Sequence, residues 1–364
     1  MFATGATAAA LENHSPEYIA AVSRLWDNMI GKRMFITGGV GAVHFDEKFG
    51  PDYFLPTDAY LETCAAVGAG FFSQRMNELT GDAKYMDELE RTLYNNVLTG
   101  ISLSGTQYTY QNPLNSVKHA RWSWHDCPCC PPMFLKMMSA MPGFIYSQKG
   151  SDVYVNLFVG SETEMTLADR NRVRLTQKTG YPWEGVVTMT VEPEKEKTFI
   201  LKVRIPGWAQ GVENPYGLYR SEVRSAVSLK VNGKSVPLKI FKGYAEIQRK
   251  WKKGDQVELT LPVQPRLVTA NEAVADLQDK VAIAAGPFVY CLEGCDNEGL
   301  ADLKVDMRSP LSITFEKGLL NGINVIKGQA LDKTGKKVPV TAIPYYALGN
   351  RQDKGYAVWI PASK

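Results

Sequence analysis

The segment from Pro132 to Leu157 reads PMFLKMMSAMPGFIYSQKGSDVYVNL, and two structural patterns meet within it. Its first ten residues form a helical pattern that ends at Pro142-Gly143, because proline and glycine both terminate helices. From Asp152 onward, apolar residues alternate with polar ones, as they do in a half-buried strand. The chain therefore changes from helices to strands near residue 150. This order predicts a segregated α+β fold rather than a parallel α/β sheet.

Four helices are predicted before that change. The clearest runs from Pro16 to Ile30, where Ser15 is a suitable N-cap and Pro16 occupies the first helical position. Its apolar residues recur three and four residues apart, which favours an amphipathic helix. The other three helices are expected at residues 59–79, 82–98 and 132–141.

Short strands and tight turns follow residue 150. Val231-Asn232-Gly233-Lys234 is a strong hairpin signal, because Asn-Gly suits a two-residue turn. This pattern predicts β-sandwiches. We expect a helical domain at residues 1–148, a β-sandwich domain at 149–268 and a C-terminal β-sandwich domain at 269–364.

The composition excludes several classes of partner. The chain has 364 residues, 45% hydrophobic and 22% charged, which is typical of a globular protein. Its net charge of +3 is small and there is no basic block, so we expect no nucleic-acid partner. No apolar run approaches the roughly 20 residues that span a bilayer, so we expect no membrane partner.

The run Cys127-Pro128-Cys129-Cys130 is the strongest chemical signal in the chain. Cysteines adjacent in sequence rarely bridge to each other, because a disulfide needs converging Cβ vectors. Soft ligands presented by a proline-flanked turn favour zinc. The residues alone do not distinguish a closed structural zinc from a reactive one. Free thiols favour a reducing compartment. The localisation is otherwise open, because a signal peptide would be absent from this sequence if an N-terminal segment were missing.

Three further residues could join this run, although each has an ordinary alternative. Glu47 lies in a charged loop and could simply be solvated, whereas Glu62 could complement a helix dipole. Cys64 could be a small core residue. Glu62 and Cys64 are two positions apart, so on a regular helix they would diverge by about half a turn. Cys291 and Cys295 are expected to be buried or free thiols.

Six motifs together resemble glycoside hydrolase families 127 and 146, the β-L-arabinofuranosidases. They occur in the families' order, and the resemblance covers essentially the whole chain. The motifs are RLWDNM (24–29), FITGGVG (35–41), LPTDAYLETC (55–64), LYNN (93–96), YQNPL (110–114) and CCPP (129–132).

The resemblance implies a zinc-bound cysteine nucleophile, a glutamate acid/base and retention of configuration at the anomeric carbon. It implies Zn²⁺ as the cofactor and an arabinofuranoside-containing glycan as the ligand, whereas a homodimer is left open. Cys127 lies outside the shared pattern and receives no role. Matched position by position, the nucleophile is Cys129, the acid/base is Glu47, the zinc ligands are Glu62, Cys64, Cys129 and Cys130, and Tyr110 and Glu90 line the sugar pocket.

The chain begins late relative to these families. Their catalytic domain is an (α/α)6 barrel, and residues 1–145 match only its later helices. We expect either a fragment or a chain that a second polypeptide completes, with an apolar surface patch along residues 1–145. The missing pocket wall leaves the activity of this chain open.

A non-catalytic, zinc-stabilised carbohydrate-binding protein is the alternative. It would use aromatic side chains of the β part to stack on sugars, although single aromatics in sandwiches usually belong to the core. The candidates are Trp183, Trp208, Trp251 and Trp359.

Overall fold

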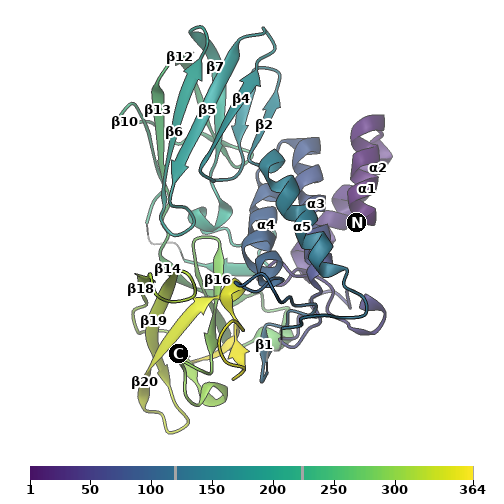
Figure 1. The fold of residues 1–364 in the computed structure, drawn as a ribbon, viewed down its shortest axis with the longest axis vertical. Helices are drawn as coiled ribbons and strands as arrows, with labels where there is room; N and C mark the ends of the chain where they lie inside the picture. Colours follow the sequence, from purple (N-terminus) through teal and green to yellow (C-terminus); the bar gives the residue numbers. More distant parts are fainter. Residues whose placement is uncertain (119–120, 223–224, 364) are drawn as a thin grey trace.

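The computed structural model describes residues 1–118, 121–222 and 225–363, and it has a mixed α+β architecture. The helices lie along one side, two facing sheets lie at one end and a third sheet lies at the other (Figure 1). No helix in the described ranges is long and apolar enough to cross a membrane. The α-helices are α1 (Phe2–Asn13), α2 (Pro16–Asn28), α3 (Thr63–Thr80), α4 (Lys84–Thr92) and α5 (Cys130–Ala140).

The helices agree with the predicted pattern in their positions but not at several of their ends. Ser15 caps α2 by accepting a hydrogen bond from the backbone N–H of Tyr18, as predicted. Helix α3 begins at Thr63, not near residue 59, because Leu61 has a positive φ of 47° and Glu62 is extended. Helix α1 was not predicted, since its Ala- and Thr-rich sequence lacks apolar periodicity.

Residues 146–260 contain two facing antiparallel-rich sheets, which agrees with the predicted sandwich. One core lies between them and includes Leu201 and Val257, both 0% exposed. The predicted turn joins β9 to β10, with Asn232 and Gly233 both at positive φ. The strands are β2 (Tyr146–Lys149), β3 (Asp152–Val155), β4 (Ser161–Thr166), β5 (Arg172–Thr179), β6 (Val186–Pro193), β7 (Lys197–Arg204), β9 (Ser228–Val231), β10 (Lys234–Ser235), β11 (Ile240–Phe241), β12 (Tyr244–Trp251) and β13 (Asp255–Thr260).

The third sheet differs from the expected C-terminal sandwich because it closes on itself. Its path runs β16-β20-β19-β17-β22-β15, and a pairing of β15 with β16 completes the ring. The predicted boundary at 268/269 falls within β14, all of which pairs in this sheet. The strands are β1 (Asn115–Ser116), β8 (Tyr219–Ser221), β14 (Pro265–Ala270), β15 (Lys280–Ala285), β16 (Phe288–Glu293), β17 (Lys304–Asp306), β18 (Ser312–Glu316), β19 (Ile323–Leu331), β20 (Lys337–Pro344), β21 (Tyr356–Ala357) and β22 (Ile360–Ser363).

Strand β16 shows why this closure is invisible in the sequence. Every one of its residues is buried. Val289 and Cys291 face one core, whereas Phe288, Tyr290 and Leu292 face another. A strand buried on both faces has no polar–apolar alternation, so its pattern does not reveal which sheet or barrel it joins.

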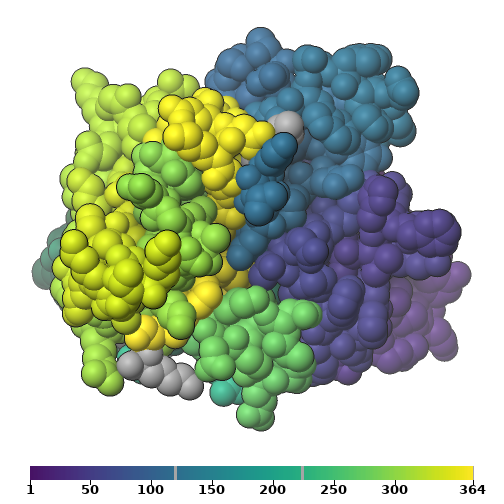
Figure 2. Space-filling view, turned by 90° about the horizontal axis from the view of Figure 1, so that it is seen from below, coloured from purple at the N-terminus to yellow at the C-terminus, as the bar shows by residue number. Residues whose placement is uncertain are grey.

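The helical part packs directly against the third sheet, as Figure 2 shows where the blue and purple segments meet the yellow ones. Strand β1 extends from the helical part and pairs with β21. The helices also contact the sandwich through Arg204, which is fully buried. Its guanidinium binds Asp87 at 2.6 Å and also the carboxylate of Glu90. The three parts therefore form one connected body.

The helical part, where an apolar surface patch was predicted, contains an apolar hollow and several exposed apolar side chains. A hollow of about 410 Å³ is lined mainly by apolar residues of α1, α2 and α3 and by Phe49. Ten of the seventeen exposed large hydrophobic residues among the described ranges lie within residues 1–145. They are Met1, Phe2, Tyr18, Leu25, Phe45, Phe49, Phe54, Val117, Trp124 and Leu135.

Replacing Arg204 with methionine is expected to destabilise the protein strongly. The change leaves the carboxylates of Asp87 and Glu90 without their buried cation, which costs about 3–5 kcal/mol. Arg172→Met is the matched control, because Arg172 is 57% exposed and pairs only with surface carboxylates. Urea denaturation monitored by circular dichroism measures both variants. Equal unfolding midpoints would show that the buried pair adds nothing.

Candidate metal centre

The first pair of candidate ligands lies where an extended segment enters helix α3. Glu62 is the N-cap residue, with φ −60° and ψ 138°, and Cys64 lies in the first turn. Because Glu62 is outside the helix, the divergence expected from a regular helix does not arise. The side chains of Glu62 and Cys64 can therefore face the same point.

The second pair lies at the start of helix α5. Cys129 is the N-cap residue and Cys130 is the first helical residue, followed by Pro131 and Pro132. Proline suits this first turn because its missing N–H would have no helical partner there. Two helix N-termini thus approach the same site, and their partial positive charge favours thiolates and carboxylates.

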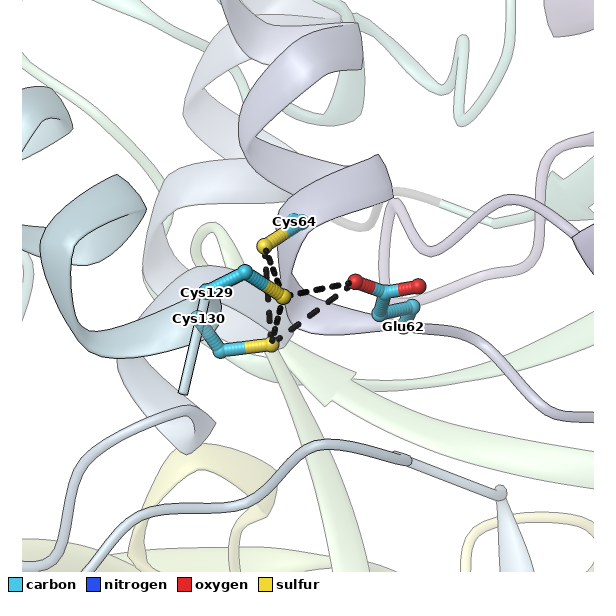
Figure 3. Close-up of side chains that lie close together, drawn as sticks. All are labelled: Glu62, Cys64, Cys129 and Cys130. Atoms are coloured by element: carbon cyan, nitrogen blue, oxygen red, sulfur yellow. Dashed lines mark hydrogen bonds between the residues drawn. The ribbon is translucent and has the colours of Figure 1, made fainter. Parts of the chain in front are cut away.

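The four side chains point toward one another (Figure 3). The Sγ atom of Cys64 lies 3.4 Å from that of Cys129 and 3.5 Å from that of Cys130. The Sγ atoms of Cys129 and Cys130 are 3.9 Å apart. Oε1 of Glu62 lies 3.5 Å from the Cys129 sulfur and 3.8 Å from the Cys130 sulfur. These separations are far longer than a disulfide bond, and all six cysteines are free.

This spacing fits a tetrahedral metal ion. Four donors at about 2.3 Å from a central ion lie about 3.8 Å from one another, close to the observed separations. Three sulfurs with one carboxylate form a donor set that suits Zn²⁺. The geometry is therefore compatible with a metal ion held by Glu62, Cys64, Cys129 and Cys130.

The protonation of these groups also depends on a cation. Burial, followed by the charge of Glu47, raises the pKa of Glu62. The hydrogen bond to Cys130 and burial together raise the pKa of Cys64. Burial raises the pKa of Cys129 to about 12. Without a metal the thiols of Cys64 and Cys129 keep their protons at neutral pH, whereas a bound divalent cation would displace them.

The hydroxyl groups of two tyrosines lie beside the four candidate ligands. The hydroxyl of Tyr110 lies 3.3 Å from the Cys129 sulfur. The hydroxyl of Tyr60 lies 3.3 Å from Oε1 of Glu47 and 3.5 Å from Oε2 of Glu62. Glu47 itself is exposed, in the short turn Phe45–Glu47. The structure therefore brings Glu47 and Tyr110 to the same centre as the four candidate ligands.

Glu90 is not brought to this centre. Its side chain is 1% exposed and is bound by Arg204, by the hydroxyl of Tyr181 at 2.9 Å and by the indole of Trp208. These partners belong to the sandwich. Its carboxylate therefore lies in a buried ion pair between domains.

Sequence reasoning missed Tyr60, Trp122 and His125. Trp122 stacks on His125 with ring centroids 4.5 Å apart, and both contact the ring of Tyr110. Tyr60 precedes Glu62 by two residues, but Leu61 between them has a positive φ of 47°, so neither a helical nor an extended pattern predicts that the two side chains meet.

The remaining cysteines lie outside the centre. Cys127 is exposed and is not part of the group of four ligands. Cys291 is buried. Cys295 lies beside Glu293 and Asp296, but the guanidinium of Arg351 already binds both carboxylates. A protein cation thus neutralises that second acidic group.

Comparison with known proteins connects this centre to one family. Sequence models of the β-L-arabinofuranosidase GH127 catalytic, GH127 middle and family 127 C-terminal domains match residues 2–143, 152–263 and 265–361. A non-reducing end β-L-arabinofuranosidase from Bifidobacterium longum subsp. longum is 28% identical over 375 residues, covering 92% of this chain and 54% of the relative.

The solved structures that resemble this chain include members of the same family. A GH127 β-arabinofuranosidase superposes with a TM-score of 0.94 and 38% identity, over 100% of this chain and 59% of that chain. A GH127 β-L-arabinofuranosidase from Geobacillus stearothermophilus T6 superposes with a TM-score of 0.92 and 36% identity. The match covers 99% of this chain and 59% of that chain. This chain thus spans between about half and three fifths of the length of these relatives.

Replacing one ligand is expected to remove the metal. Purified wild-type protein should hold about one zinc per chain by elemental analysis. Mutations of residues that orient metal ligands typically weaken metal binding about 10- to 100-fold. Cys64→Ser changes a ligand itself, so it should weaken metal binding more than that. Cys127→Ser is the matched control and should keep full occupancy, because that thiol is exposed. Equal zinc content in the two variants would contradict the four-ligand set.

Three consecutive domain matches of one family, over nearly the entire chain, show that this protein belongs to glycoside hydrolase family 127.

Proposed function

We propose that this chain carries the catalytic centre of a retaining glycoside hydrolase that releases terminal β-L-arabinofuranose. The observation that carries the proposal is the convergence of three sulfurs and one carboxylate oxygen beside Tyr110 and Glu47. Relatives described as β-L-arabinofuranosidases support the substrate class. Because the chain spans about half of the curated relative, its activity on its own is part of the proposal.

Zinc is the proposed cofactor, with Glu62, Cys64, Cys129 and Cys130 as its ligands. Its chemical contribution is to keep the thiols ionised at neutral pH, so that the Cys129 sulfur is nucleophilic. Three thiolates and a carboxylate together carry more negative charge than a divalent ion neutralises. The surplus would favour an electron-rich sulfur and stabilise the positive charge that develops on the sugar.

Two displacements complete the reaction. Glu47 donates its proton to the glycosidic oxygen while the Cys129 sulfur attacks the anomeric carbon, so that the leaving alcohol departs and a thioglycoside forms. Glu47 then removes a proton from water, whose oxygen attacks the same carbon and releases the Cys129 sulfur. Each displacement inverts the anomeric carbon, so the sugar leaves with its original configuration.

The remaining residues have supporting roles. We assign Tyr110 to the sugar pocket, because its hydroxyl lies beside the proposed nucleophile. Glu90 receives a structural role, since its carboxylate is fully used by Arg204, Tyr181 and Trp208.

The alternative, a carbohydrate-binding protein without catalysis, has lost its main support. Trp251 and Trp359 are 0% exposed and Trp208 is 7% exposed, so all three belong to the core. Trp183 is half-buried and stacks on Phe288. Three of the four tryptophans therefore offer no free ring for stacking on a sugar.

Turnover of p-nitrophenyl β-L-arabinofuranoside tests the proposal. Cys129→Ser should abolish turnover, because the nucleophile is lost. Glu47→Gln should lower kcat by about 10²- to 10⁴-fold, the usual contribution of a general acid/base. Cys127→Ser is the control and should match wild type. Equal activity in all four proteins would exclude the mechanism, whereas no turnover at full zinc occupancy would favour an incomplete pocket.

Tyr60→Phe should affect substrates unequally. Its hydroxyl contacts Glu47, so its loss should misplace the acid and slow kcat/KM about 10-fold for an alkyl arabinofuranoside, whose leaving group needs protonation. The p-nitrophenyl substrate, whose leaving group departs readily, should change little. Equal slowing of both substrates would mean that Tyr60 does not act through Glu47.

A further inference from the structure

Asn112 is buried behind the segment that carries Glu62 and Cys64, and its side chain makes three hydrogen bonds of 3.0 Å or less. Its Nδ2 group donates to the carbonyl of Leu61 at 3.0 Å and to Oγ1 of Thr63 at 2.9 Å. Its Oδ1 atom accepts from the hydroxyl of Thr109 at 2.8 Å. Asn112 is 0% exposed, so water cannot replace these bonds. Its amide therefore contacts the residues immediately before and after Glu62.

The backbone forms a second set of bonds between the same two segments. The N–H of Asn112 donates to the carbonyl of Tyr60 at 3.1 Å, and the N–H of Thr63 donates to the carbonyl of Tyr110 at 3.0 Å. Leu61, which lies between Tyr60 and Thr63 in the sequence, has a φ of 47°. This backbone conformation costs a non-glycine residue about 1–3 kcal/mol. Such a conformation persists only where surrounding bonds hold it. Residues 109–112 supply several of those bonds, and the carbonyls of Gly41 and Ala42 accept from the N–H groups of Leu61 and Tyr60.

The closed C-terminal sheet holds the other side of Asn112. Tyr345, directly after β20, is 0% exposed and its hydroxyl lies 2.8 Å from the carbonyl of Asn112 and 2.9 Å from that of Pro113. Tyr356 of β21 also donates to the Pro113 carbonyl, at 2.6 Å. The chain of contacts thus runs from the C-terminal sheet through Asn112 to the candidate ligands.

We propose that Asn112 is a positioning residue for the metal centre and that Tyr345 anchors it to the C-terminal sheet. Asn112 holds Glu62 and Cys64 at the separation from Cys129 and Cys130 that one ion requires. This inference rests on the metal site of the proposed function. It gives the C-terminal domain a part in metal binding although that domain contributes no ligand.

The test measures how fast zinc-loaded protein releases its ion to an excess of a chromogenic chelator. Asn112→Ala should release zinc about 10- to 100-fold faster than wild type, as changes in residues that orient ligands do. The Co²⁺-substituted variant should also show altered thiolate-to-cobalt absorption bands. A merely destabilising change would leave these bands as they are in the wild type.

Asn95→Ala is the matched control. Asn95 is also 0% exposed, donates to the carbonyls of Arg91 and Pro287, and accepts from the N–H of Val289. It therefore also joins the helical part to the C-terminal sheet, but none of these three hydrogen bonds reaches residues 60–64. Its variant should lose similar stability to urea while keeping the wild-type release rate and cobalt spectrum.

Tyr345→Phe removes one hydroxyl and keeps the ring, so it serves if Asn112→Ala does not fold. It should accelerate zinc release in the same direction, by a smaller factor. Release from Asn112→Ala or Tyr345→Phe at the rate of Asn95→Ala would overturn the inference. A wild-type protein that binds no zinc would instead overturn the proposed metal site, so the two failures are distinguishable.

Discussion

The proximity of four acidic groups is the constraint on which the rest of this structure depends. Three thiols and a carboxylate lie within 4.8 Å of one another, and burial raises the pKa values of Glu62 and Cys129. They cannot all ionise there unless a cation compensates them. Two helix N-termini supply part of that positive potential, and the donor geometry suits a metal ion for the remainder. Helices α3 and α5 carry these groups, and residues 109–112 connect the segment of Glu62 and Cys64 to the C-terminal sheet.

The parts of the fold that the sequence could predict are those in which a local signal decides the structure. Ser15 and Pro16 begin a helix, and Asn232-Gly233 makes a turn, whatever lies around them. The start of α3 was misplaced because residues 60–63 are held out of the helix by bonds from residues 109–112 and from the carbonyls of Gly41 and Ala42, which no local pattern reveals. The closure of the third sheet was missed because β16 is apolar on both faces.

The residues of the candidate site also divide into those that the sequence predicted and those that it did not. The group of Glu62, Cys64, Cys129 and Cys130 was predicted because the motif resemblance joined two distant segments, and the structure places these atoms together. Glu90 was predicted to line the sugar pocket, whereas in the structure its carboxylate binds Arg204. A buried carboxylate that pairs with an arginine from another domain cannot be distinguished in the sequence from one in a pocket. Tyr60 was overlooked since its position depends on the misplaced helix start.

The separation of the two ligand pairs along the chain has a consequence for biosynthesis. Cys64 and Cys129 are 65 residues apart, so no complete donor set exists until α3 and α5 have docked. Metal capture would therefore follow the folding of the helical part, and the bound ion would close a long loop that favours the folded state. Until then the thiols stay open to oxidation. The supply of the metal ion and the redox conditions during synthesis would thus determine how much of the protein matures.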